Sequence, residues 1–140
     1  MSSDAVTLEA LVAAFRARTL DRSQWTHAAH LQVGAWYLLQ YGEVDALTHL
    51  RAEISALNEA HGHENTDHSG YHDTITWAFL RLLAEVRRQQ PPSASAEDLA
   101  AQAVAVLSDR TVLTRYYSPE VLASPEARRR VMPPDRLALP

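Results

Sequence analysis

The chain has 140 residues, of which 46% are hydrophobic, and this length and composition suit one globular domain spanning residues 1–140. The formal net charge of −4 predicts no general attraction to nucleic acid or to anionic membranes, so neither is an expected partner. Cysteine is absent, which excludes disulfide bonds, thiolate nucleophiles and thiolate metal sites. Residues 1–15 lack the features of a secretion signal, and no segment has the length of a membrane span, so we expect a cytoplasmic protein.

The first two helices are predicted from apolar spacing and from their capping residues. Only four glycines occur, and alanine and leucine recur, which favours helices over strands. A helix over residues 7–18 would bury one stripe, formed by Leu8, Leu11, Val12 and Phe15. The next helix is expected to begin near Thr26, a capping residue, and to end at Tyr41 before Gly42. Because it has little polar surface, we expect it at the centre of the fold.

Of the two helices that follow, the first has the clearest periodicity in the chain. Over residues 43–60 the apolar side chains fall within an arc of roughly 140° at 100° per residue. They are Val44, Leu47, Leu50, Ile54 and Leu57. After a polar loop, a helix over residues 71–88 is predicted to end before Pro91. Its buried residues are expected to be Ile75, Phe79, Leu82 and Val86.

The C-terminal third is predicted to hold shorter helices. Ser95 and Asp98 resemble a capping box that opens a helix reaching Leu107. Two Ser-Pro-Glu triplets, at residues 118–120 and 124–126, are typical of helix starts, and the last ten residues are expected to be extended. The sequence therefore predicts an all-α fold: an up-and-down bundle of four to five helices with short C-terminal helices and an extended tail.

Six of the seven histidines lie near only three predicted helix ends. If short connections make neighbouring helices antiparallel, the starts of the helices at residues 26 and 71 and the end of the helix at residue 60 meet at one end of the bundle. His49 is left outside this group.

A metal site is the sharpest hypothesis for this end. His27 and His30, three residues apart, share one helix face, and Gly34 leaves space or a close helix contact beneath them. His72 and His61 are expected to point inward from two other segments. Neutral imidazoles are good ligands, and three of them match catalytic metal sites with one position open to water. We therefore expect His27, His30 and His72, with His61 next, to bind zinc, iron, nickel or manganese.

Tyr71 and Asp73 are the candidate catalytic residues. The Tyr71 hydroxyl would donate to a bound anion or act as a general acid, and Asp67 or Asp73 would bind the metal or orient a histidine. Against these hypotheses, a single inward histidine is more often a hydrogen-bonded core residue than a ligand. His63 and His68, and the arginine run at residues 128–130, are interpreted as solvated surface.

Three blocks of sequence carry a resemblance. WTHAAHL, GYHDTIT and YYSPEVLASPEARR, the last followed by PPD, resemble motifs of a family of small, uncharacterised bacterial all-helical proteins. The resemblance spans most of the chain and implies a helical fold and a bacterial cytosolic setting, but no activity or cofactor. His27, His30 and His72 fall within these blocks.

Three functions follow from these patterns. The first is a small metalloprotein whose ion activates water or a substrate oxygen; whether it is an enzyme stays open. The second is a metal-free module that binds a small anionic metabolite through helix N-termini, histidines and Tyr71. The third is a structural or partner-binding protein, and the apolar helix from residue 95 suggests a homodimer.

Overall fold

The structure is a computed structural model that describes residues 7–140, and over this range it is all-α, with no strand. The expectation about a secretion signal falls partly on residues 1–6, which lie outside this range. In chain order the helices are α1 (Leu8–Arg16), the 3-10 helix η1 (Arg22–Gln24), α2 (His27–Tyr41), α3 (Glu43–Ala60), α4 (Asp73–Arg88), α5 (Ala96–Val106), the 3-10 helix η2 (Arg110–Arg115), α6 (Pro119–Ala123) and α7 (Pro125–Arg129).

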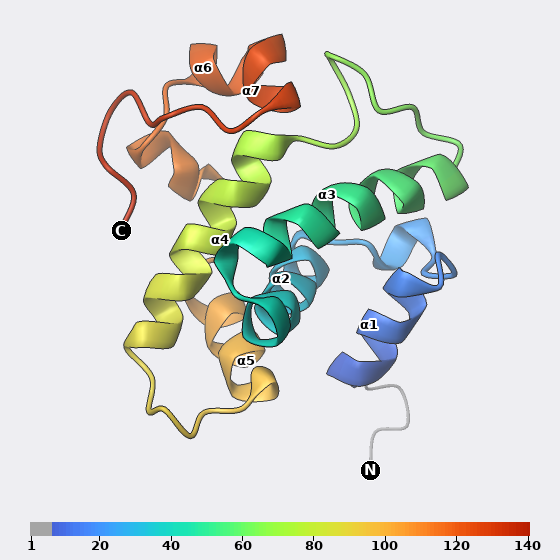
Figure 1. The fold of residues 1–140 in the computed structure, drawn as a ribbon, viewed down its shortest axis with the longest axis vertical. Coiled ribbons are helices and arrows are strands. Elements are labelled where there is room, and N and C mark those ends of the chain that lie inside the picture. The colour runs from blue at the N-terminus through green and yellow to red at the C-terminus, as the bar shows by residue number, and fades with distance from the viewer. Residues whose placement is uncertain (1–6) are drawn as a thin grey trace.

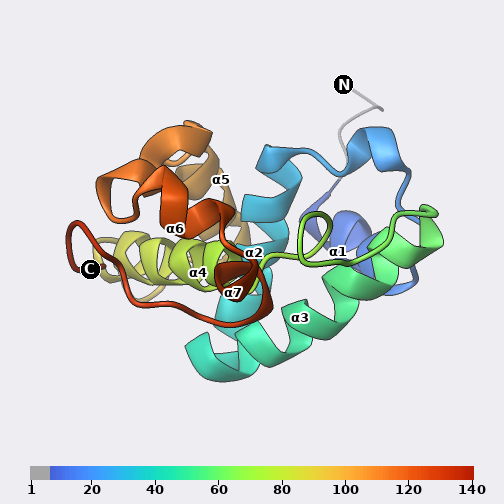
Figure 2. The ribbon, with the colours of Figure 1, turned by 90° about the horizontal axis from the view of Figure 1, so that it is seen from above.

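Helix α2 is the centre of the fold, as predicted. It contacts α1, α3, α4 and α5, and its most extensive contact is with α5. Figures 1 and 2 show these helices on its different sides, with α6 and α7 near the start of α4. The axes of α3 and α4 cross in Figure 1, so the helices form a bundle without lying parallel to one another.

Most predicted helix boundaries are confirmed because the predicted caps are formed. The Thr26 hydroxyl accepts from the backbone N–H of Ala29, and Gly42 ends α2 with a φ of 81°. Ser95 and Asp98 form the reciprocal capping box at the start of α5. The two short helices α6 and α7 begin with Pro119 and Pro125, as the triplets predicted.

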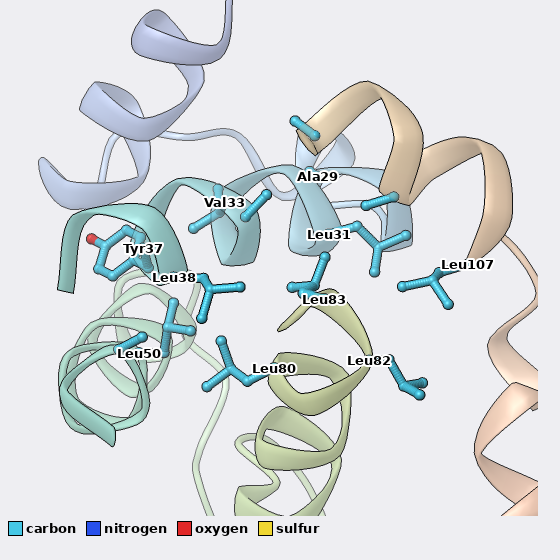
Figure 3. Packing of buried hydrophobic residues seen from close by; sticks show 14 of the residues in the cluster. Ala29, Leu31, Val33, Tyr37, Leu38, Leu50, Leu80, Leu82, Leu83 and Leu107 are labelled. Atoms are coloured by element: carbon cyan, nitrogen blue, oxygen red, sulfur yellow. The ribbon is translucent and has the colours of Figure 1, made fainter. Parts of the chain in front are cut away.

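The close-packed core lies where α2 meets α3, α4 and α5. Figure 3 shows leucines of α2, α3 and α4 facing one another there. Gly34 of α2 allows a close contact with α4, because a Cβ atom at this position would lie 2.9 Å from Cδ1 of Leu83. Both alternatives left open for Gly34 are borne out, because it contacts Leu83 and also lines the apolar cavity described below.

Two predictions from the sequence are wrong in detail, one about where a helix begins and one about a buried residue. Helix α4 begins at Asp73 rather than Tyr71, because the imidazole of His72 caps it: Nδ1 accepts from the N–H of Ile75 at 3.1 Å. Val44 was placed in the buried arc of α3 but is 70% exposed, because it lies at the edge of that arc, about 60° from Leu47 at 100° per residue.

The C-terminal tail is extended and packs on the body. The fully buried Thr74 hydroxyl donates to the carbonyl of Arg130 at 2.7 Å and accepts from the N–H of Met132 at 3.0 Å. The Tyr117 hydroxyl donates to the carbonyl of Met132 at 2.8 Å. Within residues 7–140, no helix combines the length and the apolar character that crossing a membrane requires.

Candidate ligand-binding site

The start of α2, the end of α3, and the loop that leads into α4 meet at one end of the molecule. Each imidazole of the four proposed metal ligands is hydrogen-bonded to a backbone carbonyl there. The bonded pairs are His27 Nε2 with Leu107 at 2.9 Å, His30 Nδ1 with Thr26 at 2.6 Å, His61 Nε2 with Leu20 at 2.8 Å, and His72 Nε2 with Leu122 at 2.7 Å. Because a carbonyl only accepts, the nitrogen named in each pair carries the hydrogen.

These bonds restrict what the histidines can ligate. His72 uses both nitrogens, one to donate to Leu122 and one to cap α4. In the part of the chain that the structure describes, no three histidine, aspartate or glutamate side chains lie close enough together to hold a metal ion. A site formed by His27, His30, His72 and His61 would therefore require these side chains to move, and metal binding stays a prediction.

The two candidate catalytic residues bond to each other. The Tyr71 hydroxyl donates to Asp73 at 2.7 Å, and Arg51 binds both carboxylate oxygens of Asp73 at 3.0 Å. Asp73 is only 2% exposed. Burial of the Tyr71 side chain, together with the hydrogen bond from Tyr71 to Asp73, raises the pKa of Tyr71. The hydroxyl therefore keeps its proton at neutral pH, and this network joins α3 to the start of α4. Asp67, the other candidate carboxylate, pairs with Arg129.

An apolar cavity of about 310 Å³ lies beside these residues. Most of its wall is aliphatic or aromatic and comes from α2, α3, α4, η2 and α6. The apolar members are Trp25, Leu31, Leu50, Ile54, Ile75, Phe79, Leu80, Leu83, Leu113 and Leu122. Ile75 and Phe79 were expected in the core, and they are half-buried because they face this cavity. We call it the apolar chamber.

A second cavity, of about 540 Å³, adjoins the chamber and is lined by polar and cationic groups. Arg22, Arg110 and Arg128 line it, and no aspartate or glutamate does. Arg128 donates to the carbonyl of Gly70 at 2.9 Å, which holds its guanidinium against the loop before α4. Within residues 7–140 neither Arg22 nor Arg110 makes a side-chain hydrogen bond or ion pair. We call this cavity the cationic mouth.

An aspartate directly precedes each of Arg22 and Arg110 in the sequence, but both carboxylates bond to groups outside the mouth. Asp21 and Asp109 cap the 3-10 helices η1 and η2, where they accept from the N–H groups of Ser23 and Thr111. Hydrogen bonds from the side chains and backbones of these partners lower the pKa of both aspartates. Their oxygens therefore serve the caps, and neither aspartate lines a cavity.

The chamber and the mouth share part of their walls and form one hollow. The shared residues are Trp25, His30, Ile54, Ile75, Thr76 and Arg110. His30 is held rigidly at this boundary, because its ring stacks on Trp25 with centroids 3.7 Å apart and Nδ1 bonds to Thr26. The His30 side chain is exposed to solvent, but partial desolvation by the groups around it, together with the neighbouring His27 and Arg110, lowers its pKa to about 4. His30 is therefore neutral at pH 7, and its Nε2 is an acceptor.

The sequence did not single out the residues that define the mouth. Arg128 was interpreted as part of a solvated run, and Arg22 and Arg110 belong to no motif. All 13 basic residues of the chain are arginines, so composition gives no signal for these three. His30, His61 and His72 were expected at one end of the bundle, and they do line the mouth, together with His63, which bonds to Ser69.

The geometry of the hollow is what points to a function. The chain was compared with protein-family models, with curated proteins and with solved structures, and no match was found in any of the three. The resemblance of the three sequence blocks to small bacterial helical proteins stays a prediction. Function is therefore inferred from the side chains around the hollow alone.

Proposed function

We propose that this protein binds a small organic anion whose apolar body occupies the chamber and whose charged group occupies the mouth. The observation that carries this proposal is the joining of an apolar cavity to a mouth with three arginines and no carboxylate in its lining. Ligand sites are typically concave and mostly apolar, with few polar groups that fix orientation, and the hollow has these properties.

The apolar chamber supplies affinity through burial. Transfer of apolar surface out of water contributes roughly 25 cal/mol per Å². Phe79 and Ile75 offer half-buried surface from α4, and Leu122 closes the chamber from α6. A ligand with a short alkyl or phenyl body would cover these side chains.

The mouth supplies the preference for negative charge. Guanidinium groups donate to carboxylate or phosphate oxygens in pairs, and such charge-assisted bonds are stronger than bonds between neutral groups. Arg22 and Arg110 have no partner within the described residues, so their donors are available to a ligand. No carboxylate belongs to the lining, so none would lie against a bound anion.

Calorimetric titration tests the proposal with compounds matched in shape. We expect hexanoate and 3-phenylpropanoate to bind, and their primary amides and inorganic phosphate to bind at least tenfold more weakly, because each lacks one of the two features that the hollow recognises. Arg110→Gln should weaken carboxylate binding about tenfold, the loss of one charge-assisted bond. Arg115→Gln is the matched control, since Arg115 is exposed on the same 3-10 helix and lines neither cavity.

Filling the chamber gives an independent test. Leu122→Phe adds volume to the chamber wall from α6 and should abolish binding of 3-phenylpropanoate while the helical circular dichroism is retained. Equal binding of acids and amides, or an equal effect of Arg110→Gln and Arg115→Gln, would contradict the proposal.

The metalloprotein hypothesis is the second candidate, and one observation favours it. With one nitrogen bonded to a carbonyl, His27, His30 and His61 each keep a second nitrogen that has no hydrogen-bond partner within residues 7–140. Metal analysis of protein purified without a histidine tag tests this candidate. A stoichiometric zinc, iron, nickel or manganese ion that is lost in His30→Ala would favour it over anion binding.

Two further proposals concern the setting of the protein. Cytoplasmic location fits the absence of cysteine, which makes the fold independent of an oxidising compartment. A homodimer through α5 is supported by Val106, which is 52% exposed at the end of that helix. Light scattering after gel filtration would test the dimer, and Val106→Glu should reduce any dimer found.

A further inference from the structure

His30 gives the hollow a hydrogen-bond acceptor at the boundary between chamber and mouth. Its Nδ1–H donates to Thr26, so in the neutral ring Nε2 carries the free lone pair. Stacking on Trp25 fixes the ring plane, and within the described residues no group donates to Nε2. The acceptor is therefore positioned before a ligand binds, and a bound ligand would cover it.

Arg110 lies near this acceptor. Both side chains line both cavities, and the guanidinium is close enough for its charge to act on the His30 ring. A carboxylate bound to Arg110 would therefore place its neighbouring carbon atoms beside His30. Thr76 also lies at the boundary, but its hydroxyl already donates to the carbonyl of His72 at 2.8 Å.

We infer that the ligand of the hollow is a carboxylate that carries a hydroxyl or N–H donor on one of the first carbons after the carboxyl group, such as a 2-hydroxy acid with an apolar side chain. The carboxylate pairs with Arg110, the donor bonds to Nε2 of His30, and the side chain enters the chamber. This inference rests on the proposed binding of an organic anion and adds the chemical class of that anion. A ligand without the donor would cover Nε2 and leave it unpaired, which costs free energy.

The test compares 3-phenylpropanoate with 2-hydroxy-3-phenylpropanoate, which differ by one hydroxyl group. Both enantiomers of the hydroxy acid are titrated at pH 7.5, into the wild type and into His30→Phe. The phenylalanine keeps a ring for stacking on Trp25 but has no acceptor. In the wild type we expect the better enantiomer to bind about 3- to 10-fold more tightly than the unsubstituted acid, the range of one neutral hydrogen bond. In His30→Phe this advantage should disappear.

The outcomes separate this inference from the proposal beneath it. If neither acid binds the wild type, anion binding itself fails. If both bind with equal affinity, or if His30→Phe keeps the advantage of the hydroxy acid, anion binding stands and the assigned class is wrong. The wild-type comparison remains decisive even if His30→Phe does not fold.

Discussion

Helix α4 presents one apolar stripe, yet the two halves of the stripe have different surroundings. Leu82 and Val86, in the second half, are buried in the close-packed core. Ile75 and Phe79, in the first half, are half-buried and line the hollow. Both halves have the same spacing of four residues, and three residues separate Phe79 from Leu82. The difference shows that an apolar stripe predicts which face of a helix turns inward, whereas the partners of that face decide whether the space is filled.

The largest expected effect comes from truncating the two halves of this stripe. Leu82→Ala should lower the free energy of unfolding by about 2–4 kcal/mol, because Leu82 is 5% exposed and its truncation leaves a cavity. Ile75→Ala should cost about 1 kcal/mol, because Ile75 already borders open space. Urea denaturation measures both values. Equal losses would show that the first half of the stripe is packed as closely as the second.

The second test concerns what holds the start of α4 in place. Asp73→Asn removes the charge that Arg51 binds with two hydrogen bonds, and we expect a loss of about 2 kcal/mol, since Asp73 is buried although Arg51 is half-exposed. Asp67→Asn breaks a pair that is exposed on both sides and should cost much less. A loss for Asp73→Asn no larger than that of the control would mean that the network does not stabilise this end.

The third test uses pH, because two histidines with a lowered pKa, His30 and His72, lie at the hollow end of the stripe. Desolvation lowers the pKa of His72, and that of His30 to about 4, below the value near 6.5 in an unfolded chain. Between these values the unfolded chain binds more protons, so stability is lost as the pH falls below about 6.5. His30 retains solvent contact, which reduces the effect. As the pH falls to 4.5, we expect the free energy of unfolding of the wild type to decrease by about 1 kcal/mol more than that of His30→Phe.

The smallest effect on stability is expected from the mouth. Arg110→Gln should change the free energy of unfolding by no more than about 0.5 kcal/mol in either direction, because the side chain is exposed. The same substitution should weaken anion binding, as proposed above. A large loss of stability would show that Arg110 supports the fold. The core and the hollow would then differ less in their contribution to stability than we describe.

The fold was largely predictable because its signals are local. Thr26, Gly42, Ser95 and Asp98 set helix ends through bonds to neighbouring backbone groups, and such bonds can be predicted from nearby residue types alone. The exposed position of Val44 agrees with its place at the edge of the apolar arc of α3, because the other four residues of the arc, which are buried, lie about 60° or more away from it.

The candidate site was predictable only in part. The meeting of three helix ends followed from connection lengths, and His30, His61 and His72 do line one cavity. Their bonds to the carbonyls of residues 26, 20 and 122 depend on long-range packing, which spacing within a helix does not contain. The three arginines were missed because they come from η1, η2 and α7, segments too short to show periodicity.

The two imidazole–carbonyl bonds to Leu107 and Leu122 also bear on how the protein is made. They join positions 80 and 50 residues apart, His27 to Leu107 and His72 to Leu122. During synthesis, α1 to α4 leave the ribosome before η2 and α6 supply their part of the chamber wall. Until then Ile75 and Phe79 would face water. The hollow is therefore among the last parts of the molecule to be completed, and a nascent chain ending before Leu122 would expose the very side chains that later contact the ligand.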